Sequence, residues 1–301
     1  MGEQIRKLYS WPTVDEERLR QLVKTYEITV KLFCFACLAQ LWNERNQRAD
    51  LVIAEEHRTT LNTFMTLRKD NAETFDYLRL IITVLQIFSD NKVKPFMPEC
   101  DGLGAELTDA STTQAHDFME EMRAELRGDI PANQVASFCE QAETHLATIL
   151  SDMAFITLYV AKTIKKIEVW KFRSAQARYL YTEVPLDRVS NTPADYKYFS
   201  NDISDSGCVV LQKYPLAPNN YLNLAPFIVD ENSFSSTCVS NLFFLSYYDG
   251  DDDTYRYASV FDPSIVLVVS SVAENLVSND RQRANNAVKA MFDEFKATVL
   301  L

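Results

Sequence analysis

The sequence predicts an α+β protein, with an N-terminal helical bundle that includes a long heptad-patterned helix, followed by an antiparallel β-sheet capped by a C-terminal helix. Three observations lead to this class. Helical periodicity with few turn-forming residues runs through residues 1–178, short apolar runs rich in tyrosine and valine follow, and a helical stripe returns near the C-terminus. We therefore expect a helical region over 1–178 and a region of antiparallel sheet plus C-terminal helix over 179–301, forming one domain or two.

The first helices are predicted from their apolar stripes. From Asp15 onward apolar residues recur at alternating spacings of four and three, and beyond Ile28 the opposite helix face is apolar as well. This pattern predicts a buried helix in the middle of the bundle, with Glu27 and Lys31 paired across one turn. Shorter helices are expected near residues 55–68, 72–89 and 113–126, and residues 90–112, with two prolines and two glycines, are expected to form a loop.

A long helix over residues 131–173 is predicted from an unbroken alternation of four and three between Val135 and Val160. At 1.5 Å per residue it would be about 60 Å long and would need packing partners along its length. Those partners would be the earlier helices or a second copy of the chain, so a homo-oligomer is one possible interpretation. Its second half carries basic residues within about 100° of one another, which favours either binding of an anionic partner or pairing with the protein's own acidic residues. These residues are Lys162, Lys165, Lys166 and Arg173.

The second region is predicted to contain strands at residues 179–184, 208–214, 221–229, 242–248, 255–261 and 265–270. The runs 242–248 and 255–261 flank an acidic turn at 249–253 and should form an antiparallel hairpin. A helix near residues 280–299 should cover one face of the sheet. Tyrosines combine a large contact area with a polar tip, so those of the hairpin are candidate interface residues. They are Tyr247, Tyr248, Tyr255 and Tyr257.

Motifs that would name a chemistry are missing from the sequence. Its 6 glycines are too few and too scattered for a phosphate-binding loop, and the serine-hydrolase and zinc-protease signatures are absent. Cys34 and Cys37 form a CxxC inside the most apolar helix, so we expect them to be buried, reduced and without a metal. His116 and Glu120 stand four apart on a helix and could share a metal, but the HExxH and ExxH patterns of metal sites are both absent. No cofactor and no metal site is expected.

Two weaker candidates remain open in the second region. Cys208 could act as a nucleophile if a histidine came close in space, although a buried strand cysteine is the commoner case. Asp249, Asp251 and Asp253 occupy the first, third and fifth positions of a calcium loop. That loop also needs a glycine at its sixth position and a glutamate at its twelfth, which Thr254 and Val260 replace. A solvated hairpin turn is therefore favoured over a looser surface site for a cation.

The leading functional hypothesis is a non-enzymatic interaction or regulatory protein that acts within a cytosolic protein complex. The alternatives are a hydrolase-like enzyme that uses Cys208 or carboxylates, and a sensor that binds a small anionic or nucleotide signal through the basic helix. A net charge of −12 disfavours nucleic acid as the partner. The 6 cysteines fit a reducing cytoplasm, and the longest apolar stretch, residues 28–42, is too short to span a membrane.

Overall fold

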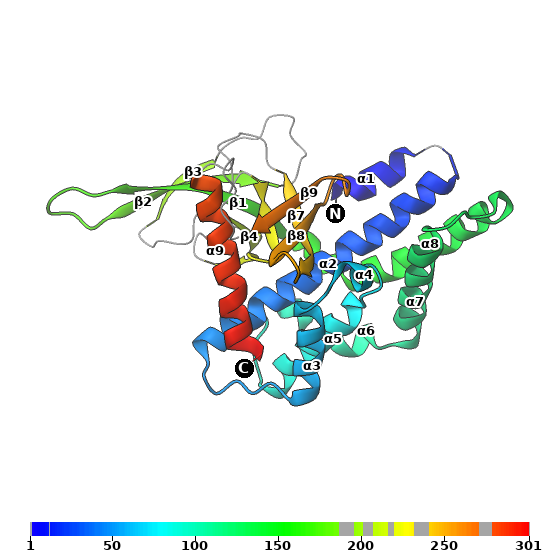
Figure 1. Cartoon of the computed structure of the whole chain (residues 1–301), viewed down its shortest axis with the longest axis horizontal. Helices are drawn as coiled ribbons and strands as arrows, with labels where there is room; N and C mark the ends of the chain where they lie inside the picture. The colour runs from blue at the N-terminus through cyan, green and yellow to red at the C-terminus, as the bar shows by residue number, and fades with distance from the viewer. Residues whose placement is uncertain are drawn as a thin grey trace. The chain divides into compact units, whose positions relative to one another are not determined.

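The computed structural model describes residues 2–11, 13–186, 196–200, 207–215, 220–231, 241–270 and 279–300 (Figure 1). The chain forms two compact units, one from residues 1–38, 52–57 and 74–157, and the other from residues 39–51, 58–73 and 158–301. The predicted α+β class is confirmed, since helices come first, antiparallel sheets follow and a helix lies at the C-terminus. Among the described residues, no helix has the length and apolar content needed to cross a bilayer.

The first unit is helical. Its helices are α1 (Gly2–Ser10), the first part of α2 (Glu16–Gln47), α5 (Tyr77–Asp90), α6 (Leu103–Leu107), α7 (Ala110–Glu125) and α8 (Ala132–Asp152), with 3₁₀ turns at Pro98–Cys100 and Ala154–Leu158. The predicted central helix corresponds to α2, where Tyr26 and Phe33 are buried and Lys31 pairs with Glu27 at 2.6 Å. Cys34 and Cys37 are buried as predicted and form no disulfide, and burial raises the pKa of both thiols well above the usual range.

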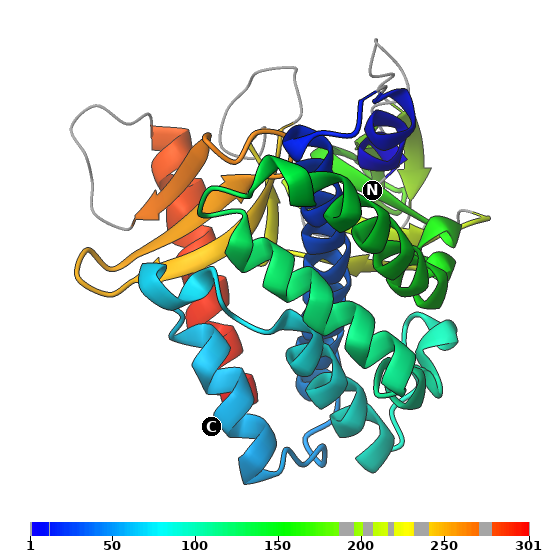
Figure 2. The same cartoon turned by 90° about the vertical axis from the view of Figure 1, so that its right-hand side faces the viewer.

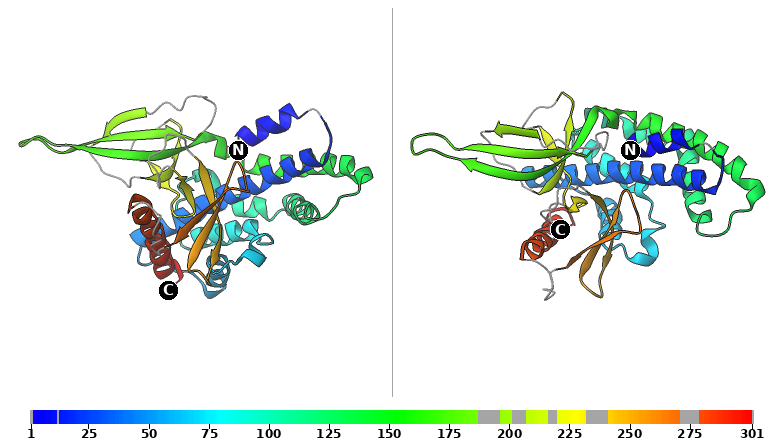
Figure 3. Two further views of the ribbon diagram at one scale, coloured as in Figure 1. Left: turned by 45° about the horizontal axis from the view of Figure 1, so that its top comes forward. Right: turned by 90° about the horizontal axis from the view of Figure 1, so that it is seen from above.

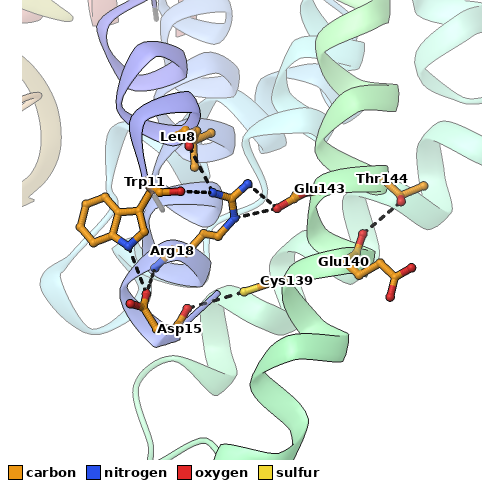
Figure 4. Close-up of polar contacts among 8 residues, drawn as sticks. All are labelled: Leu8, Trp11, Asp15, Arg18, Cys139, Glu140, Glu143 and Thr144. Carbon is orange, nitrogen blue, oxygen red and sulfur yellow. Dashed lines mark hydrogen bonds and ion pairs between the residues drawn. The ribbon is translucent and has the colours of Figure 1, made fainter. Parts of the chain in front are cut away.

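Arg18 joins three helices of this unit (Figure 4). Its guanidinium donates to the carbonyl oxygens of Leu8 and Trp11 at 3.2 and 3.1 Å, which close the end of α1 and its connection to α2. The same group pairs with Glu143 of α8 at 2.7 Å. One planar cation thus satisfies carbonyl groups at a helix end and bridges α2 to α8.

The second unit contains the end of α2, most of α3 (Glu55–Met65), α4 (Lys69–Ala72), α9 (Asn279–Phe295) with a final π-helical turn at Lys296–Leu300, and two sheets. The first sheet has the order β3-β2-β1-β4-β5 and the second has the order β6-β7-β8-β9, with every pairing antiparallel. The strands are β1 (Tyr159–Trp170), β2 (Arg178–Pro185), β3 (Tyr196–Ser200), β4 (Cys208–Lys213), β5 (Tyr221–Asn223), β6 (Ile228–Asp230), β7 (Leu242–Asp249), β8 (Thr254–Ser259) and β9 (Val266–Ser270).

Helix α9 packs on the second sheet, as predicted for the C-terminal helix (Figure 2). Its Phe292 ring stacks on Tyr255 of β8 with centroids 3.9 Å apart, and both rings are buried. Phe227, which precedes β6, lies between the rings of Phe64, Phe292 and Phe295 at 5.1–6.2 Å. These aromatic contacts form the core between α3, α9 and the strands.

The prediction of one helix over residues 131–173 is wrong. Helix α8 ends at Asp152, a 3₁₀ turn follows, and β1 begins at Tyr159, so sheet structure starts well before residue 178. The cause is that Val160 and Ile164 are four residues apart, a spacing that keeps both on one face of a helix and also on one face of a strand. The β-branched residues of 159–170 favour the strand. The predicted 60 Å helix therefore does not exist. The argument for a homo-oligomer depended on the packing partners that such a helix would need, so it no longer applies.

The other strands lie close to their predicted places, with two exceptions. Residues 196–200 form β3, which the sequence reading did not include, and the expected strand at 221–229 is divided between β5 and β6 in different sheets. A turn separates these two strands, where the side chain of Asn223 accepts the backbone N–H of Ala225 at 3.0 Å. The predicted hairpin is confirmed as β7 and β8.

Candidate interaction surface

The basic residues assigned to a helical stripe lie on a strand and a turn, which corrects that prediction. Lys162 is buried on β1, and Lys165 stands at a bulge between the residue pairs of Ile164 and Lys166. Lys166 is exposed and pairs with Glu168 at 2.5 Å, and Arg173 is exposed in the turn after β1. A strand alternates its side chains between two faces, so these cations do not form one stripe.

Strands β1 and β2 form a hairpin that extends beyond β4 on one side, while β3 accompanies β2 as far as Tyr179 on the other (Figure 1, Figure 3). Strand β4 pairs with β1 only as far as Ile164, whereas β1 continues to Trp170. At about 3.3 Å per residue, this continuation is about 20 Å long. Residues 171–177 connect the two strands, and Trp170 pairs with Arg178 at the end of the ladder.

The end of the hairpin exposes large apolar side chains. Trp170 is 49% exposed and Phe172 is 72% exposed, and Val169 is 62% exposed. Trp170 makes an edge-to-face contact with Phe199 of β3 at 5.8 Å, and the Arg178 guanidinium lies 4.3 Å from the Phe199 ring. We define the hairpin tip surface by the exposed aromatic and basic residues gathered here. Its members are Trp170, Lys171, Phe172, Arg173, Arg178 and Phe199.

The hairpin is also the basic part of an acidic chain. Residues 165–178 contain five basic residues and one acidic residue, Glu168, which gives them a net charge of +4. The whole chain carries −12, so the remaining residues carry −16. A positive, aromatic tip on an otherwise acidic protein is an electrostatic arrangement that favours contact with a local negative surface.

At the base of the same hairpin lies a buried polar cluster. Lys162 donates from Nζ to Glu183 Oε2 at 3.2 Å and to Gln212 Oε1 at 3.0 Å, and Tyr198 OH donates to Glu183 Oε1 at 2.8 Å. Lys162, Glu183 and Gln212 are all less than 10% exposed. Burial, together with the hydrogen bond to the Glu183 carboxylate, raises the pKa of Tyr198 far above the usual phenol value. The hydrogen bonds of this cluster lie within the protein, and those of Lys162 connect β1 to β2 and to β4.

The predicted interface tyrosines fall into two groups. Tyr255 and Tyr257 are buried, and Tyr257 OH donates to the carbonyl oxygen of Pro226 at 2.7 Å. Tyr247 and Tyr248 are partly exposed, and Tyr248 OH donates to Asp253 at 2.8 Å. Lys296 lies 4.8 Å from the Tyr248 ring and donates to Tyr255 OH at 2.9 Å. The buried pair belongs to the core, so these four residues do not form one exposed face.

Three of the four carboxylates of the acidic turn are engaged by basic side chains. Asp249 and Asp252 pair with Arg256 at 3.5 and 3.4 Å, and Asp253 pairs with Lys289 of α9. Hydrogen bonds from Lys289 and Tyr248 hold the pKa of Asp253 below its usual range. Among the described residues, no three histidine, cysteine, aspartate or glutamate side chains are grouped so as to hold a metal ion.

Cys208 lies in the apolar interior of the first sheet. It starts β4, is 3% exposed, and belongs to a buried cluster with Ile164, Tyr181 and Val210. A catalytic thiol needs both access to substrate and a group that stabilises the thiolate. The position of Cys208 offers no access, so it adds nothing to the enzyme hypothesis.

The first unit contains a chain of hydrogen bonds around His116. His116 Nδ1 lies 2.6 Å from Tyr26 OH, which donates to Glu120 Oε1 at 2.7 Å, and His116 Nε2 lies 3.3 Å from Asp76 Oδ1. Arg123 pairs with the other oxygen of Glu120 at 2.6 Å. Although burial opposes ionisation of Asp76, the hydrogen bonds from His116 and from the backbone N–H of Arg79 hold its pKa below the usual range.

This arrangement predicts a pH-dependent contribution of Asp76 to stability. Because the folded-state pKa lies below the unfolded value of about 4, the carboxylate stabilises the fold above that value and loses this effect as pH falls through the folded pKa. Asp76→Asn should therefore lower the free energy of unfolding at neutral pH, and the difference should shrink as the pH is lowered from about 5 towards about 2. Urea unfolding at several pH values measures this, with Asp117→Asn, an exposed carboxylate on α7, as the control. A difference that does not vary with pH would contradict it.

The sequence reading missed the aromatic half of the hairpin tip surface. Trp170 and Phe172 stand next to Lys171 and Arg173, so an exposed aromatic and basic cluster was visible in the sequence once residues 166–173 were placed outside a helix. Phe199 joins them only through the pairing of β2 with β3, in which it stands opposite Leu180. Comparison of the chain with protein-family models, curated proteins and solved structures finds no match.

Proposed function

We propose that this chain is a non-enzymatic interaction protein that works within a protein complex, and that the hairpin tip surface is its docking element. The observation that carries the proposal is the exposure of Trp170 and Phe172 at the end of the hairpin. Neighbouring large apolar side chains left in water favour a covering partner, because burying them is worth about 25 cal/mol per Å². Tryptophan and arginine are also the residues most enriched among those that dominate binding energy at interfaces.

The position of the surface supports a docking role. The turn at 171–177 lies beyond the residues that pair with β3 and β4, so it can enter a partner without rearrangement of the sheet that holds it. Its base is fixed by the buried contacts of Lys162 with Glu183 and Gln212. A partner therefore meets a preorganised element, which reduces the entropy lost on binding. The five described cysteines are free and buried, which agrees with our proposal that this complex forms in the cytosol.

Affinity purification from the native host, with mass spectrometry of the eluate, tests the proposal. Trp170→Ala/Phe172→Ala should reduce recovery of a stoichiometric protein partner by at least about tenfold, because residues of this kind contribute about 2 kcal/mol or more each. The variant should unfold at nearly the wild-type temperature, since both side chains are exposed. Tyr214→Ala, which removes a 69% exposed aromatic elsewhere in the same unit, is the matched control and should retain the partner. Full recovery of every partner by the double variant would refute the proposal.

A further inference from the structure

We infer that the partner encloses the hairpin tip in an acidic groove, a protein surface with an apolar floor and aspartate or glutamate side chains at its rim. This inference rests on the proposed function and adds the chemistry of the partner. Three features carry it, namely two cations of the tip that have no ion-pair partner among the described residues, the exposure of both faces of the tip, and the charge of the rest of the chain.

Two cations at the tip are left for an external anion. Lys171 and Arg173 flank Phe172, and neither has an ion-pair partner among the residues that the structure describes. The neighbouring basic residues differ, since Lys166 pairs with Glu168 and Arg178 covers the Phe199 ring. Carboxylates around an apolar pocket would meet Lys171 and Arg173 while the pocket receives Phe172.

The apolar side chains of the tip point in more than one direction. Successive strand residues point to opposite faces, so Val169 and Trp170 lie on opposite sides of the hairpin, and both are exposed. Phe172 follows in the turn, where the N–H of Ala175 donates to its carbonyl oxygen at 3.1 Å. A flat partner could cover only one of these faces. A groove that receives the end of the hairpin removes all three side chains from water.

The distribution of charge favours a compact acidic protein surface over an extended polyanion. The Debye length at physiological salt is about 8 Å, so a partner bound near the tip responds mainly to the +4 of residues 165–178. A nucleic acid or an anionic bilayer extends far beyond the tip and would also meet the field of residues that carry −16. The phosphate groups of a nucleic acid, moreover, offer no apolar floor for Val169.

Site-specific photo-crosslinking identifies what covers the tip. The full-length chain with p-benzoylphenylalanine in place of Phe172 is irradiated in native host cells, and the crosslinked species is analysed by mass spectrometry. We expect a peptide of a partner protein with an excess of aspartate and glutamate. Crosslinks to nucleic acid or lipid, or to a peptide without acidic excess, would overturn the inference. The same probe at Tyr9, which is 89% exposed in the other unit, is the control and should not yield that peptide.

The salt dependence of the complex gives an independent readout. Affinity of the wild-type chain for the crosslinked partner should fall about tenfold between low and high salt, and Lys171→Gln/Arg173→Gln should bind more weakly with a much smaller salt dependence. Lys69→Gln/Lys92→Gln removes the same charge at other exposed positions and should keep the wild-type slope. An unchanged slope in the Lys171/Arg173 variant would overturn the acidic groove but leave the proposed function intact. The proposed function itself fails only if Trp170→Ala/Phe172→Ala keeps its partners.

Discussion

Lys162→Met should lower the free energy of unfolding by about 3–5 kcal/mol, because removal of one member of a buried ion pair leaves the other charge uncompensated. Lys162 and Glu183 have side chains that are 9% and 7% exposed, and their charged atoms lie 3.2 Å apart. Methionine has a similar length and fills the same space, so the loss reports the missing charge and hydrogen bonds. After the substitution, Glu183 keeps the hydrogen bond from Tyr198 at 2.8 Å but no cation.

Urea unfolding followed by circular dichroism measures this effect, and the hairpin supplies a matched control. Lys166 pairs with Glu168 on the exposed part of the same strand, with side chains 65% and 39% exposed, so Lys166→Met should cost less than about 1 kcal/mol. Adding Glu183→Gln to Lys162→Met removes the orphaned charge and should restore part of the lost stability. Equal and small losses in the Lys162 and Lys166 variants would show that the buried cluster does not hold the hairpin base.

Phe227→Ala should lower the free energy of unfolding by about 3–5 kcal/mol, because it leaves a cavity among aromatic rings that cannot collapse to fill it. The Phe227 side chain is fully buried and has the rings of Phe64, Phe292 and Phe295 as neighbours within 6.2 Å. Loss of this ring should loosen α9 in particular. Hydrogen exchange should then show faster exchange of α9 amides than in the wild-type chain.

Phe199→Ala is the counterpart of this substitution on the hairpin tip surface. Phe199 is 42% exposed, so its removal should change stability by no more than about 0.5 kcal/mol. The same substitution should weaken partner binding, because Phe199 supports Trp170 and carries the contact with Arg178. Thermal unfolding and partner recovery, measured on both variants, therefore separate the core role of Phe227 from the surface role of Phe199. A large stability loss in Phe199→Ala would contradict this division.

The hairpin illustrates how little of the candidate surface could be predicted from residue types alone. The spacing of Lys162, Lys166 and Arg173 fitted one face of a helix, yet Lys162 is buried beside Glu183 and Arg173 is exposed in a turn. In a strand a shift of one residue exchanges the two faces, and the bulge at Lys165 makes such a shift within β1. Which cations reach solvent is therefore decided by pairing with β2 and β4.

Several features of this protein were determined by the sequence itself. Apolar residues on every face of residues 28–42 require burial wherever that helix packs, so the centre of α2 and the burial of Cys34 and Cys37 follow from composition and period. The acidic turn between two short apolar runs likewise favours the β7–β8 hairpin, because the contacts involved are local.

Only the tertiary structure decided whether residues 153–173 form a helix or a strand. Their pattern satisfies the helical and the strand period together, so local physics leaves the two states close in free energy. Pairing with residues 178–185 on one side and with the distant residues 208–213 on the other selects the strand. It also provides Glu183 and Gln212 as partners for a lysine that would be costly to bury alone. These partners stand 21 and 50 residues from Lys162 in the sequence, and for that reason the hairpin and its tip surface became visible only in the fold.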